Sequence, residues 1–390
     1  MKALIFGAGN IGRGFLGAVL SKNGLEITFV DIDEQRIIDI NRIGEYPIFV
    51  VSGEGTREEN VHHLRGIHFY DTKSIVSAVK ETDIILTAVG KNALSALAPS
   101  LAQGLVQRVK TRPRSEVHVV VIACENVQDN TTYLKSLLHP HIPDEYQNQI
   151  NDLISFPNCV VDRIVPNSAP AILSKNPFAV TVEDYFQFVI DETALRFPFV
   201  PLIGVQTSPN LSATLEQKLF TLNMAHAVAG YFGYIRGYQF IHEAVQDKEI
   251  LDLLDGALEE VGLTIVWRHK SIALLAQKEY AQKIVKRFMN PHLRDEITRV
   301  AREPKRKLGA DDRLVKPALL TWEHGRIPSF LASGIVAALR YDYREDIQAQ
   351  ALVREIREKG LERVLRDVSG LPETHEIGRL VRADFLLRSL

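Results

Sequence analysis

The stretch KALIFGAGNIGRGFLGAVLSKNGLEITFVDID, residues 2–33, decides the fold of the first part of the chain. Residues 2–6 are a short apolar run, which is typical of a strand buried on both faces. The glycines that follow have the spacing G-x-G-x-x-G, and the next residues continue with helical periodicity. A second apolar run ends at Asp31. The stretch therefore predicts a strand, a glycine turn, a helix and a second strand.

Each glycine of this turn has a physical role in holding a dinucleotide. Gly7 permits the tight turn from strand to helix, Gly9 lets the backbone approach a pyrophosphate, and Gly12 lets the helix lie close to the strand. The helix then points its free N–H groups and the positive end of its dipole at the phosphates. The predicted cofactor-binding residues of the turn are Gly7, Ala8, Gly9, Asn10, Ile11 and Gly12. The alternative is a glycine turn that serves packing alone.

Asp31 stands 19 residues after Gly12, at the end of the second strand. A carboxylate there accepts hydrogen bonds from the adenosine ribose hydroxyls and repels a 2′-phosphate, so the sequence favours NAD over NADP. Arg13 has two interpretations: its side chain reaches a phosphate, or it lies in solvent.

Later segments continue the pattern. TDIILTAVG (82–90) and VHVVVIACEN (117–126) are apolar strands that end in small or polar residues, where a ligand crevice is expected, and Asn126 is a further predicted cofactor contact. Residues 91–110 are predicted to be helical. The segment around Gly53 and Gly55 predicts antiparallel strands inserted beside the parallel sheet, and residues 179–191 alternate like one strand.

A chain of 390 residues exceeds what one hydrophobic core usually serves. We expect an α/β fold: residues 1–200 as a Rossmann-type dinucleotide-binding domain, and 201–390 as a mostly α-helical substrate domain. The boundary falls within RFPFVPLIGVQTSPN (196–210), and the ligand crevice is expected between the domains. The helices are predicted at 215–234, 247–261, 269–288, 293–303, 312–322, 327–341, 346–366 and 375–388.

Composition excludes several classes of protein. The net charge of −2 gives no general attraction to nucleic acid or to an acidic membrane, and no apolar run approaches the ~18 residues of a membrane span. No signal-peptide cleavage site is evident at the N-terminus. Cys124 and Cys159 have no metal-ligand partner at the usual spacing. We therefore expect a cytoplasmic protein with reduced thiols and no metal site.

The helical segment KLFTLNMAHAVAGYFGY (218–234) carries Lys218, Asn223 and His226 among apolar neighbours. At about 100° per residue, the three share one broad face. Hydride transfer from an alcohol needs a base for the hydroxyl proton and donors for the charge that develops on oxygen. A lysine serves as that base if its surroundings lower its pKa toward roughly 7–8. Taken singly, a solvated lysine, a packed asparagine and a histidine bonded to backbone remain alternatives.

The pattern K-x-x-x-x-N-x-x-H resembles that of the polyol-specific long-chain dehydrogenases. The resemblance also includes FGAGNIGRGF (6–15), ACEN (123–126), FPNCVVDRIVP (156–166) and RKL…DRL.KP (306–317), and it extends from end to end. It implies interconversion of mannitol 1-phosphate and fructose 6-phosphate with NAD and without a metal, by a monomer or homodimer.

The same resemblance implies roles for individual residues. Lys218 is the base in oxidation and the acid in reduction, Asn223 helps to form the oxyanion site, and His226 orients the substrate. Asn158 matches an asparagine of relatives that act on free sugars, and it is a second candidate oxyanion donor. Two other functions stay open: a dehydrogenase of an unphosphorylated polyol or a hexuronate, and an NAD-binding protein without chemistry.

A sugar phosphate needs concentrated positive charge. The segment AREPKRKLGADDRLVK (301–316) supplies it, and Arg306 and Lys307 are the leading candidates for phosphate contact. The alternative is a solvated basic loop that is balanced by Glu303, Asp311 and Asp312. Nucleic-acid binding is not favoured, because this segment lacks interleaved aromatic residues.

Overall fold

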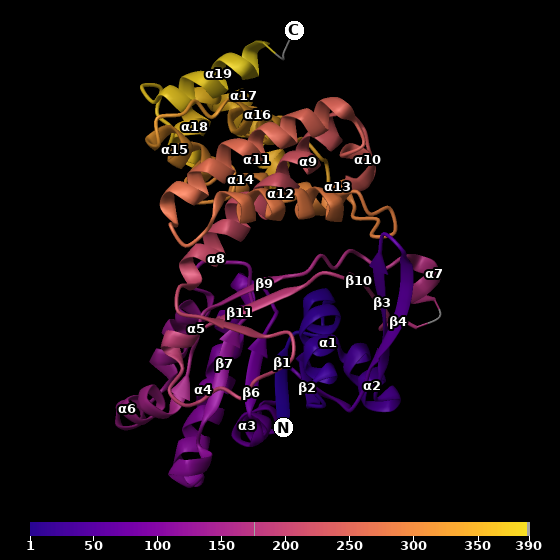
Figure 1. Ribbon diagram of the computed structural model, residues 1–390. Helices are drawn as coiled ribbons and strands as arrows, with labels where there is room; N and C mark the ends of the chain where they lie inside the picture. The colour runs from indigo at the N-terminus through magenta and orange to yellow at the C-terminus, as the bar shows by residue number, and fades with distance from the viewer. Residues whose placement is uncertain (175, 388–390) are drawn as a thin grey trace. The chain divides into compact units, whose positions relative to one another are not determined.

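The structure is a computed structural model that describes residues 1–174 and 176–387. The chain divides into two compact units, Met1–Leu211 and Ser212–Leu390. The first unit contains the sheets and the second is helical (Figure 1). The predicted fold class, a Rossmann-type α/β domain followed by a mostly helical domain, is confirmed.

The main sheet of the first unit is parallel, and its strand order over the described residues is β5-β2-β1-β6-β7-β8. The strands are β1 (Lys2–Phe6), β2 (Glu26–Asp31), β5 (Leu64–His68), β6 (Ile84–Thr87), β7 (Val119–Ala123) and β8 (Ile154–Ser155). From β1 the chain builds outward to β2 and β5 on one side, and then to β6, β7 and β8 on the other. The strand order therefore reverses between β1 and β6, which is where parallel α/β sheets bind ligands.

Alternating side chains of β1 give the sheet an apolar core on each face. Ala3 and Ile5 pack in one core with η1 (Gly12–Gly17) and α1 (Ala18–Lys22), while Leu4 and Phe6 pack in the other. The remaining helices of this unit are α2 (Glu34–Ile43), α3 (Thr72–Glu81), η2 (Lys91–Ala93), α4 (Leu94–Thr111), η3 (Arg114–Glu116), α5 (Asn130–Leu138), η4 (His139–His141), α6 (Asp144–Leu153), α7 (Pro170–Leu173) and η5 (Glu192–Ala194).

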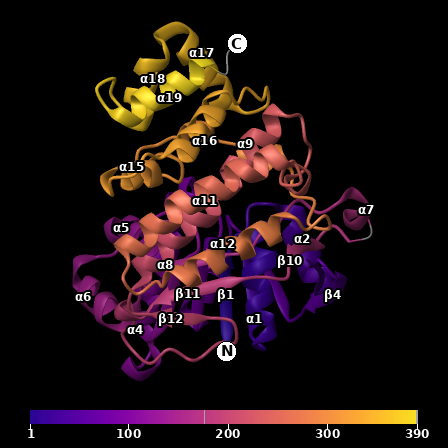
Figure 2. The ribbon, with the colours of Figure 1, turned by 45° about the horizontal axis from the view of Figure 1, so that its top comes forward.

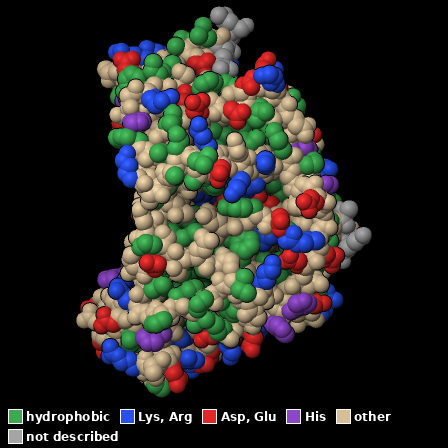
Figure 3. Space-filling view, in the orientation of Figure 1, with side chains coloured by type: hydrophobic (Ala, Val, Ile, Leu, Met, Phe, Trp, Pro, Cys, Tyr) green, Lys and Arg blue, Asp and Glu red, His purple; other side chains and the backbone are tan. Residues whose placement is uncertain are grey.

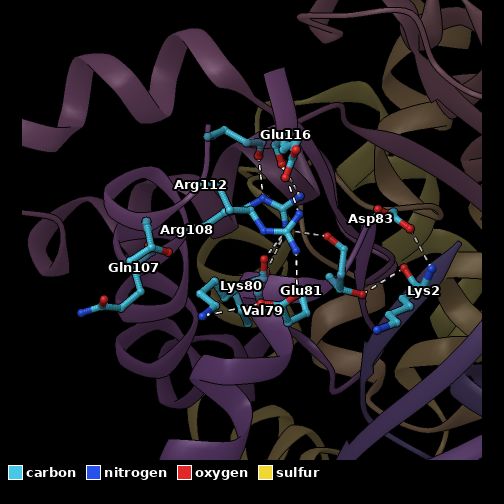
Figure 4. A network of polar contacts seen from close by, with 12 residues as sticks. Lys2, Val79, Lys80, Glu81, Asp83, Gln107, Arg108, Arg112 and Glu116 are labelled. Atoms are coloured by element: carbon cyan, nitrogen blue, oxygen red, sulfur yellow. Dashed lines mark hydrogen bonds and ion pairs between the residues drawn. The ribbon is translucent and has the colours of Figure 1, made fainter. Parts of the chain in front are cut away.

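Arg108 of α4 links backbone segments around the core that contains Leu4 and Phe6 (Figure 4). Its side chain is buried at 1% exposure, and its guanidinium donates to backbone carbonyls rather than to a carboxylate. The acceptors are the carbonyls of Val79, Lys80, Thr82, Glu116, Val117 and His118. One arginine thus satisfies carbonyls at the C-terminal end of α3, which have no partner within the helix, and carbonyls of the segment that enters β7.

Two smaller sheets accompany the main sheet in the described part of the first unit. The hairpin β3 (Tyr46–Ser52) and β4 (Gly55–Val61) is antiparallel, which confirms the predicted insertion, and β10 (Val180–Glu183) adds parallel to β3. The third sheet joins β9 (Cys159–Asp162), β11 (Gln187–Asp191) and β12 (Gln206–Ser208).

The prediction of a single strand over 179–191 is wrong. β10 and β11 belong to different sheets, and Asp184 between them bonds Arg57 of β4. In the sequence, Val180 and Val182 before the break and Phe186 and Phe188 after it keep one period of two residues, so the apolar pattern does not reveal the break.

The second unit is a stack of helices, in which α9, α11 and α16 pack against one another (Figure 2). The elements are α8 (Leu211–Gln217), η6 (Lys218–Asn223), α9 (Met224–Ile235), α10 (Ile241–Ala244), α11 (Lys248–Arg268), α12 (Leu274–Phe288), α13 (Ile297–Ala301), α14 (Pro304–Lys307), α15 (Val315–Glu323), α16 (Ser329–Leu339), α17 (Ile347–Lys359), α18 (Leu361–Ser369) and α19 (Glu376–Leu387). The helix predicted at 346–366 is two helices, because Gly360 between α17 and α18 has φ 83°.

Charged side chains of both signs intermingle on the face shown in Figure 3. Within residues 1–174 and 176–387, no helix is both long enough and apolar enough to cross a membrane.

Candidate active site

The glycine turn after β1 has the geometry that a dinucleotide site needs. Gly7 has φ 100°, and a Cβ on it would lie 2.5 Å from the carbonyl oxygen of Ala88; a Cβ on Gly12 would lie 1.9 Å from that of Gly7. At Gly9, in contrast, a Cβ would meet nothing within 4 Å. Packing therefore requires glycine at positions 7 and 12, whereas there is open space beside Gly9. The turn fits a pyrophosphate, and packing alone does not account for its three glycines.

Asp31 is held against this turn. Its Oδ2 accepts from the N–H of Ala8 at 2.6 Å, and its Oδ1 accepts from the N–H of Asp33 at 2.9 Å and from Arg36 at 3.2 Å. Its side chain is 9% exposed. The carboxylate is thus fixed at the carboxyl end of β2, beside the turn, where an adenosine ribose is expected.

The other residues of the turn lie around it. Ala8 is fully buried, Ile11 packs against the core, and Asn10 donates to the side chain of Asn167 at 3.3 Å. Arg13 matches neither of its two interpretations. It is buried, and it donates to the carbonyls of Ala8 at 2.7 Å and Phe178 at 2.6 Å, while burial lowers its pKa to about 10.

Glu125 is a buried carboxyl at the same edge of the sheet, and no role for it was expected from the sequence. It accepts from the hydroxyl of Thr87 at 2.6 Å and from the N–H of Val89 at 3.0 Å, so it ties the loop after β7 to the loop after β6. Burial raises its pKa. The only sequence signal was an acid directly after an apolar strand. Asn126, the next residue, is exposed at this edge.

Asn158 acts as a cap in this unit. Its Oδ1 accepts from the N–H groups of Thr131 and Thr132 at 3.0 and 2.9 Å, and its Nδ2 donates to the hydroxyl of Thr132 at 3.0 Å. These bonds satisfy backbone donors at the start of α5. A role as an oxyanion donor stays a prediction for its second N–H.

In the second unit, the predicted helix 215–234 is not regular. Lys218–Asn223 forms a π-helical segment between α8 and α9. Its i→i+5 hydrogen bonds place residues five apart on neighbouring positions of one face, as residues four apart are placed in an α-helix. Lys218 and Asn223 therefore lie closer to one line than the 100° spacing predicted. Such segments occur frequently at functional sites.

The environment of these two residues suits acid–base chemistry. Lys218 is 7% exposed and Asn223 is 8% exposed. The Nδ2 of Asn223 is buried and has no hydrogen-bond partner among residues 1–174 and 176–387. A buried donor without a partner costs about 1–3 kcal/mol. A substrate oxygen would satisfy it.

His226 follows on α9 and is held from outside its helix. Its Nε2 lies 2.9 Å from Oδ2 of Asp295, and Oδ1 of Asp295 accepts from Arg299 at 2.7 Å. The ring stacks on Phe288, with centroids 4.7 Å apart. Sequence reasoning missed Asp295, Arg299 and Phe288, because nothing local in the sequence links them to a histidine more than sixty residues away.

The π-helical segment has its own support in Gln277 of α12. This side chain is 1% exposed; its Oε1 accepts from Gln217 at 2.9 Å, and its Nε2 donates to the hydroxyl of Thr221 at 3.0 Å. One amide thus spans the junction between α8 and the π-helical segment.

The two phosphate candidates differ in their surroundings. Arg306 is exposed and pairs with Glu303 at 2.8 Å and Asp312 at 3.3 Å. Lys307 is buried at 3% exposure, and its Nζ donates to the carbonyls of Val300, at 2.8 Å, and Arg302. Burial lowers the pKa of Lys307 well below its ordinary value. Lys307 is therefore not part of a solvated loop, which was the alternative interpretation, and its contact with a phosphate stays a prediction.

The fold and the glycine turn define a Rossmann-type dinucleotide-binding protein with a helical second unit. Residues 1–200 match the mannitol dehydrogenase Rossmann domain, and residues 210–376 match the mannitol dehydrogenase C-terminal domain. The chain belongs to the mannitol dehydrogenase family.

Similar proteins support this assignment. The mannitol-1-phosphate 5-dehydrogenase of Bacillus pumilus is 40% identical over 379 residues, and that of Anoxybacillus flavithermus is 37% identical over 383 residues; each alignment covers 97% of both chains. Among solved structures, Pseudomonas fluorescens mannitol 2-dehydrogenase with NAD and D-mannitol has a TM-score of 0.79 at 17% identity, covering 100% of this chain and 92% of that chain. The structural likeness shows the shared fold.

Proposed function

We propose that this protein is an NAD-dependent oxidoreductase that interconverts D-mannitol 1-phosphate and D-fructose 6-phosphate. The observation that carries the proposal is the identity of 37–40% over 97% of the chain with relatives named mannitol-1-phosphate 5-dehydrogenase. The glycine turn, Asp31 and the buried Lys218 are consistent with it.

Lys218 is the proposed acid and base. During oxidation it accepts the proton of the hydroxyl that becomes the carbonyl, and during reduction it returns that proton. Its burial keeps bulk water from competing for the proton. The nicotinamide cofactor, when bound, would accept the hydride as NAD⁺ in oxidation and supply it as NADH in reduction.

Asn223 and His226 are proposed to hold the substrate. The Nδ2 of Asn223, which has no hydrogen-bond partner in the described part of the chain, suits the oxygen on which charge develops, because a donor that is already in place needs no reorganisation during the reaction. His226, fixed by Asp295 and Phe288, suits an adjacent hydroxyl. Asn158 is kept as a second candidate oxyanion donor.

The cofactor is proposed to lie on the turn Gly7–Gly12, with Asp31 at the ribose and Asn126 nearby. For the substrate phosphate we keep Arg306, whose guanidinium is partly exposed and could exchange its carboxylate partners for a phosphate. Lys307 could contribute only by giving up its carbonyl bonds.

A panel of ketoses tests the function. Purified protein should oxidise NADH with fructose 6-phosphate and respond weakly to fructose or fructuronate at the same concentration. No turnover at several millimolar fructose 6-phosphate, together with turnover of an unphosphorylated ketose, would refute the phosphate assignment. It would favour the second candidate, a dehydrogenase of a free polyol or hexuronate, which Asn158 supports. NAD binding without turnover of any sugar would indicate a non-catalytic protein.

We also propose that the protein works in the cytoplasm as a monomer or homodimer, without nucleic acid as a partner. Both cysteines are free thiols, as a reducing compartment would keep them. Light scattering coupled to size-exclusion chromatography measures the oligomeric state directly, and a larger assembly would contradict the proposal.

A further inference from the structure

Asp295 lies in a buried polar arrangement that neither the family pattern nor the sequence had indicated. Its side chain is 3% exposed, one oxygen faces Nε2 of His226, and the other bonds Arg299, which stands one helical turn later. Burial alone would raise the pKa of Asp295, but Arg299 and His226 together hold it below its ordinary value. The carboxylate is therefore ionised, and it is an acceptor only.

This acceptor determines which ring nitrogen of His226 carries the proton. A nitrogen 2.9 Å from an ionised carboxylate must be the donor, so Nε2 is protonated. Burial lowers the pKa of His226, and the positive charges of Arg299 and Arg287 lower it further. Asp295 acts in the opposite direction, but the pKa stays below its ordinary value. The ring is then neutral, and Nδ1 keeps its lone pair.

The plane of the ring is fixed as well. Phe288, at the end of α12, stacks on the imidazole with an angle of 23° between the rings. Asp295 precedes α13 and holds the ring by its edge, so two elements besides α9 determine its orientation. A histidine that served only as core filling would need neither an ionised carboxylate nor an arginine behind it.

We propose that Asp295 is a positioning residue of the reaction: it holds His226 as the Nε2–H tautomer, so that Nδ1 accepts the O–H of a substrate hydroxyl. The inference rests on the proposed function for its substrate. It assigns His226 the role of acceptor, complementary to Asn223, which is a donor. Asn223 thus orients the reacting oxygen of the substrate for Lys218, and His226 orients the neighbouring hydroxyl.

Nuclear magnetic resonance of the full chain with ¹⁵N-labelled histidine tests the tautomer without any turnover. The His226 signals, assigned by their loss in His226→Gln, should show a protonated Nε2 and a bare Nδ1 at neutral pH. Fructose 6-phosphate with NAD should shift the Nδ1 signal. A protonated Nδ1 in the wild-type protein would overturn the proposal, whatever the variants do.

Asp295→Asn tests the consequence for the reaction. Arg299 should take the amide oxygen, so that the amide nitrogen faces Nε2 and moves the ring proton to Nδ1. We expect kcat/KM for fructose 6-phosphate to fall by about 100-fold, and the NAD dissociation constant to stay unchanged. Asp295→Glu, which keeps a carboxylate, should retain the wild-type tautomer and recover part of the rate.

Glu45→Gln is the matched control, because Glu45 pairs with the exposed His62 at 2.7 Å in the first unit. It should change neither the His226 signals nor the rate. An Asp295→Asn protein that moves the ring proton but keeps its kcat/KM would refute the positioning role. A wild-type protein that does not turn over fructose 6-phosphate would refute the proposed function instead, while the ring signals still decide the tautomer.

Discussion

Gln277 donates a hydrogen bond to the hydroxyl of Thr221 at 3.0 Å, inside the π-helical segment that begins with Lys218. Its carbonyl oxygen accepts from Gln217 on the preceding turn. π-Helical turns are rare, and we expect them to form where tertiary contacts stabilise them. Gln277 is such a contact, and it is not itself expected to touch the substrate.

Gln277→Leu keeps the size of the side chain and removes both bonds. We expect a loss of about 1–3 kcal/mol in the free energy of unfolding, and a fall in kcat of about 10²-fold as Lys218 and Asn223 lose alignment. Thr264→Val is the control, because Thr264 also makes a buried bond, to Thr321, in the same unit. It should lower stability without lowering kcat, and equal effects of the two variants on kcat would contradict the role of Gln277.

Lys218→Ala should reduce turnover by about 10²–10⁴-fold, the usual contribution of a general acid or base. Binding of NAD, measured by calorimetry, should not change. In the wild-type protein the rate of mannitol 1-phosphate oxidation should fall as the pH falls, because a protonated lysine cannot accept the hydroxyl proton. Lys248→Ala, at an exposed lysine of the same unit, should leave all three measurements unaltered. A pH-independent oxidation rate would exclude Lys218 as the base.

Asn223→Leu should lower the activity without lowering the stability of the protein. The amide nitrogen of Asn223 has no described partner, so an apolar side chain of similar shape removes a buried cost, and stability should stay equal or rise. The kcat should fall by about 10²–10³-fold, as for other lost oxyanion donors.

Asn130→Leu provides the contrast in the same denaturation experiments. Asn130 is also buried, but its Nδ2 donates to the carbonyl of Cys159 at 2.9 Å, and its Oδ1 accepts from two N–H groups. This variant should be clearly destabilised. If Asn223→Leu proved equally unstable, its amide would be structural rather than reserved for substrate.

Asp31→Ala should relax the preference for NAD. Removing the carboxylate removes its repulsion of a 2′-phosphate and releases Arg36, which stands 3.2 Å away. The ratio of kcat/KM for NADP to that for NAD should rise by at least about tenfold, since like-charge contacts cost several kcal/mol. Asp31→Ala/Arg36→Ala should lose much of this gain. An unchanged ratio in Asp31→Ala would remove Asp31 from the ribose.

Arg108→Met should destabilise the first unit by more than about 3 kcal/mol, because it leaves the buried carbonyls of Val79, Thr82 and Val117 without this donor. Thermal and urea unfolding measure the loss. Arg112→Met, at a neighbour that pairs with Glu81 at the surface, should cost no more than about 1 kcal/mol. Similar losses for the two variants would show that the carbonyl contacts of Arg108 contribute little.

The sequence by itself determined the features that depend only on residues close together along the chain. The apolar run before Gly7, the spacing of the glycines and the acid at Asp31 specify a strand, turn and strand through local sterics and burial. The hairpin around Gly53 and Gly55 was predictable for the same reason.

Only the tertiary structure decided what depends on distant partners. Asp295 reaches His226 from the loop before α13, and Gln277 supports the π-helical turn from α12. Lys307 is buried and donates to backbone carbonyls, which the periodicity of the sequence does not predict. The split between β10 and β11 depends on which sheets they join. Helical and strand periods record which residues are apolar, whereas the bonds of a buried polar side chain depend on what long-range packing brings beside it.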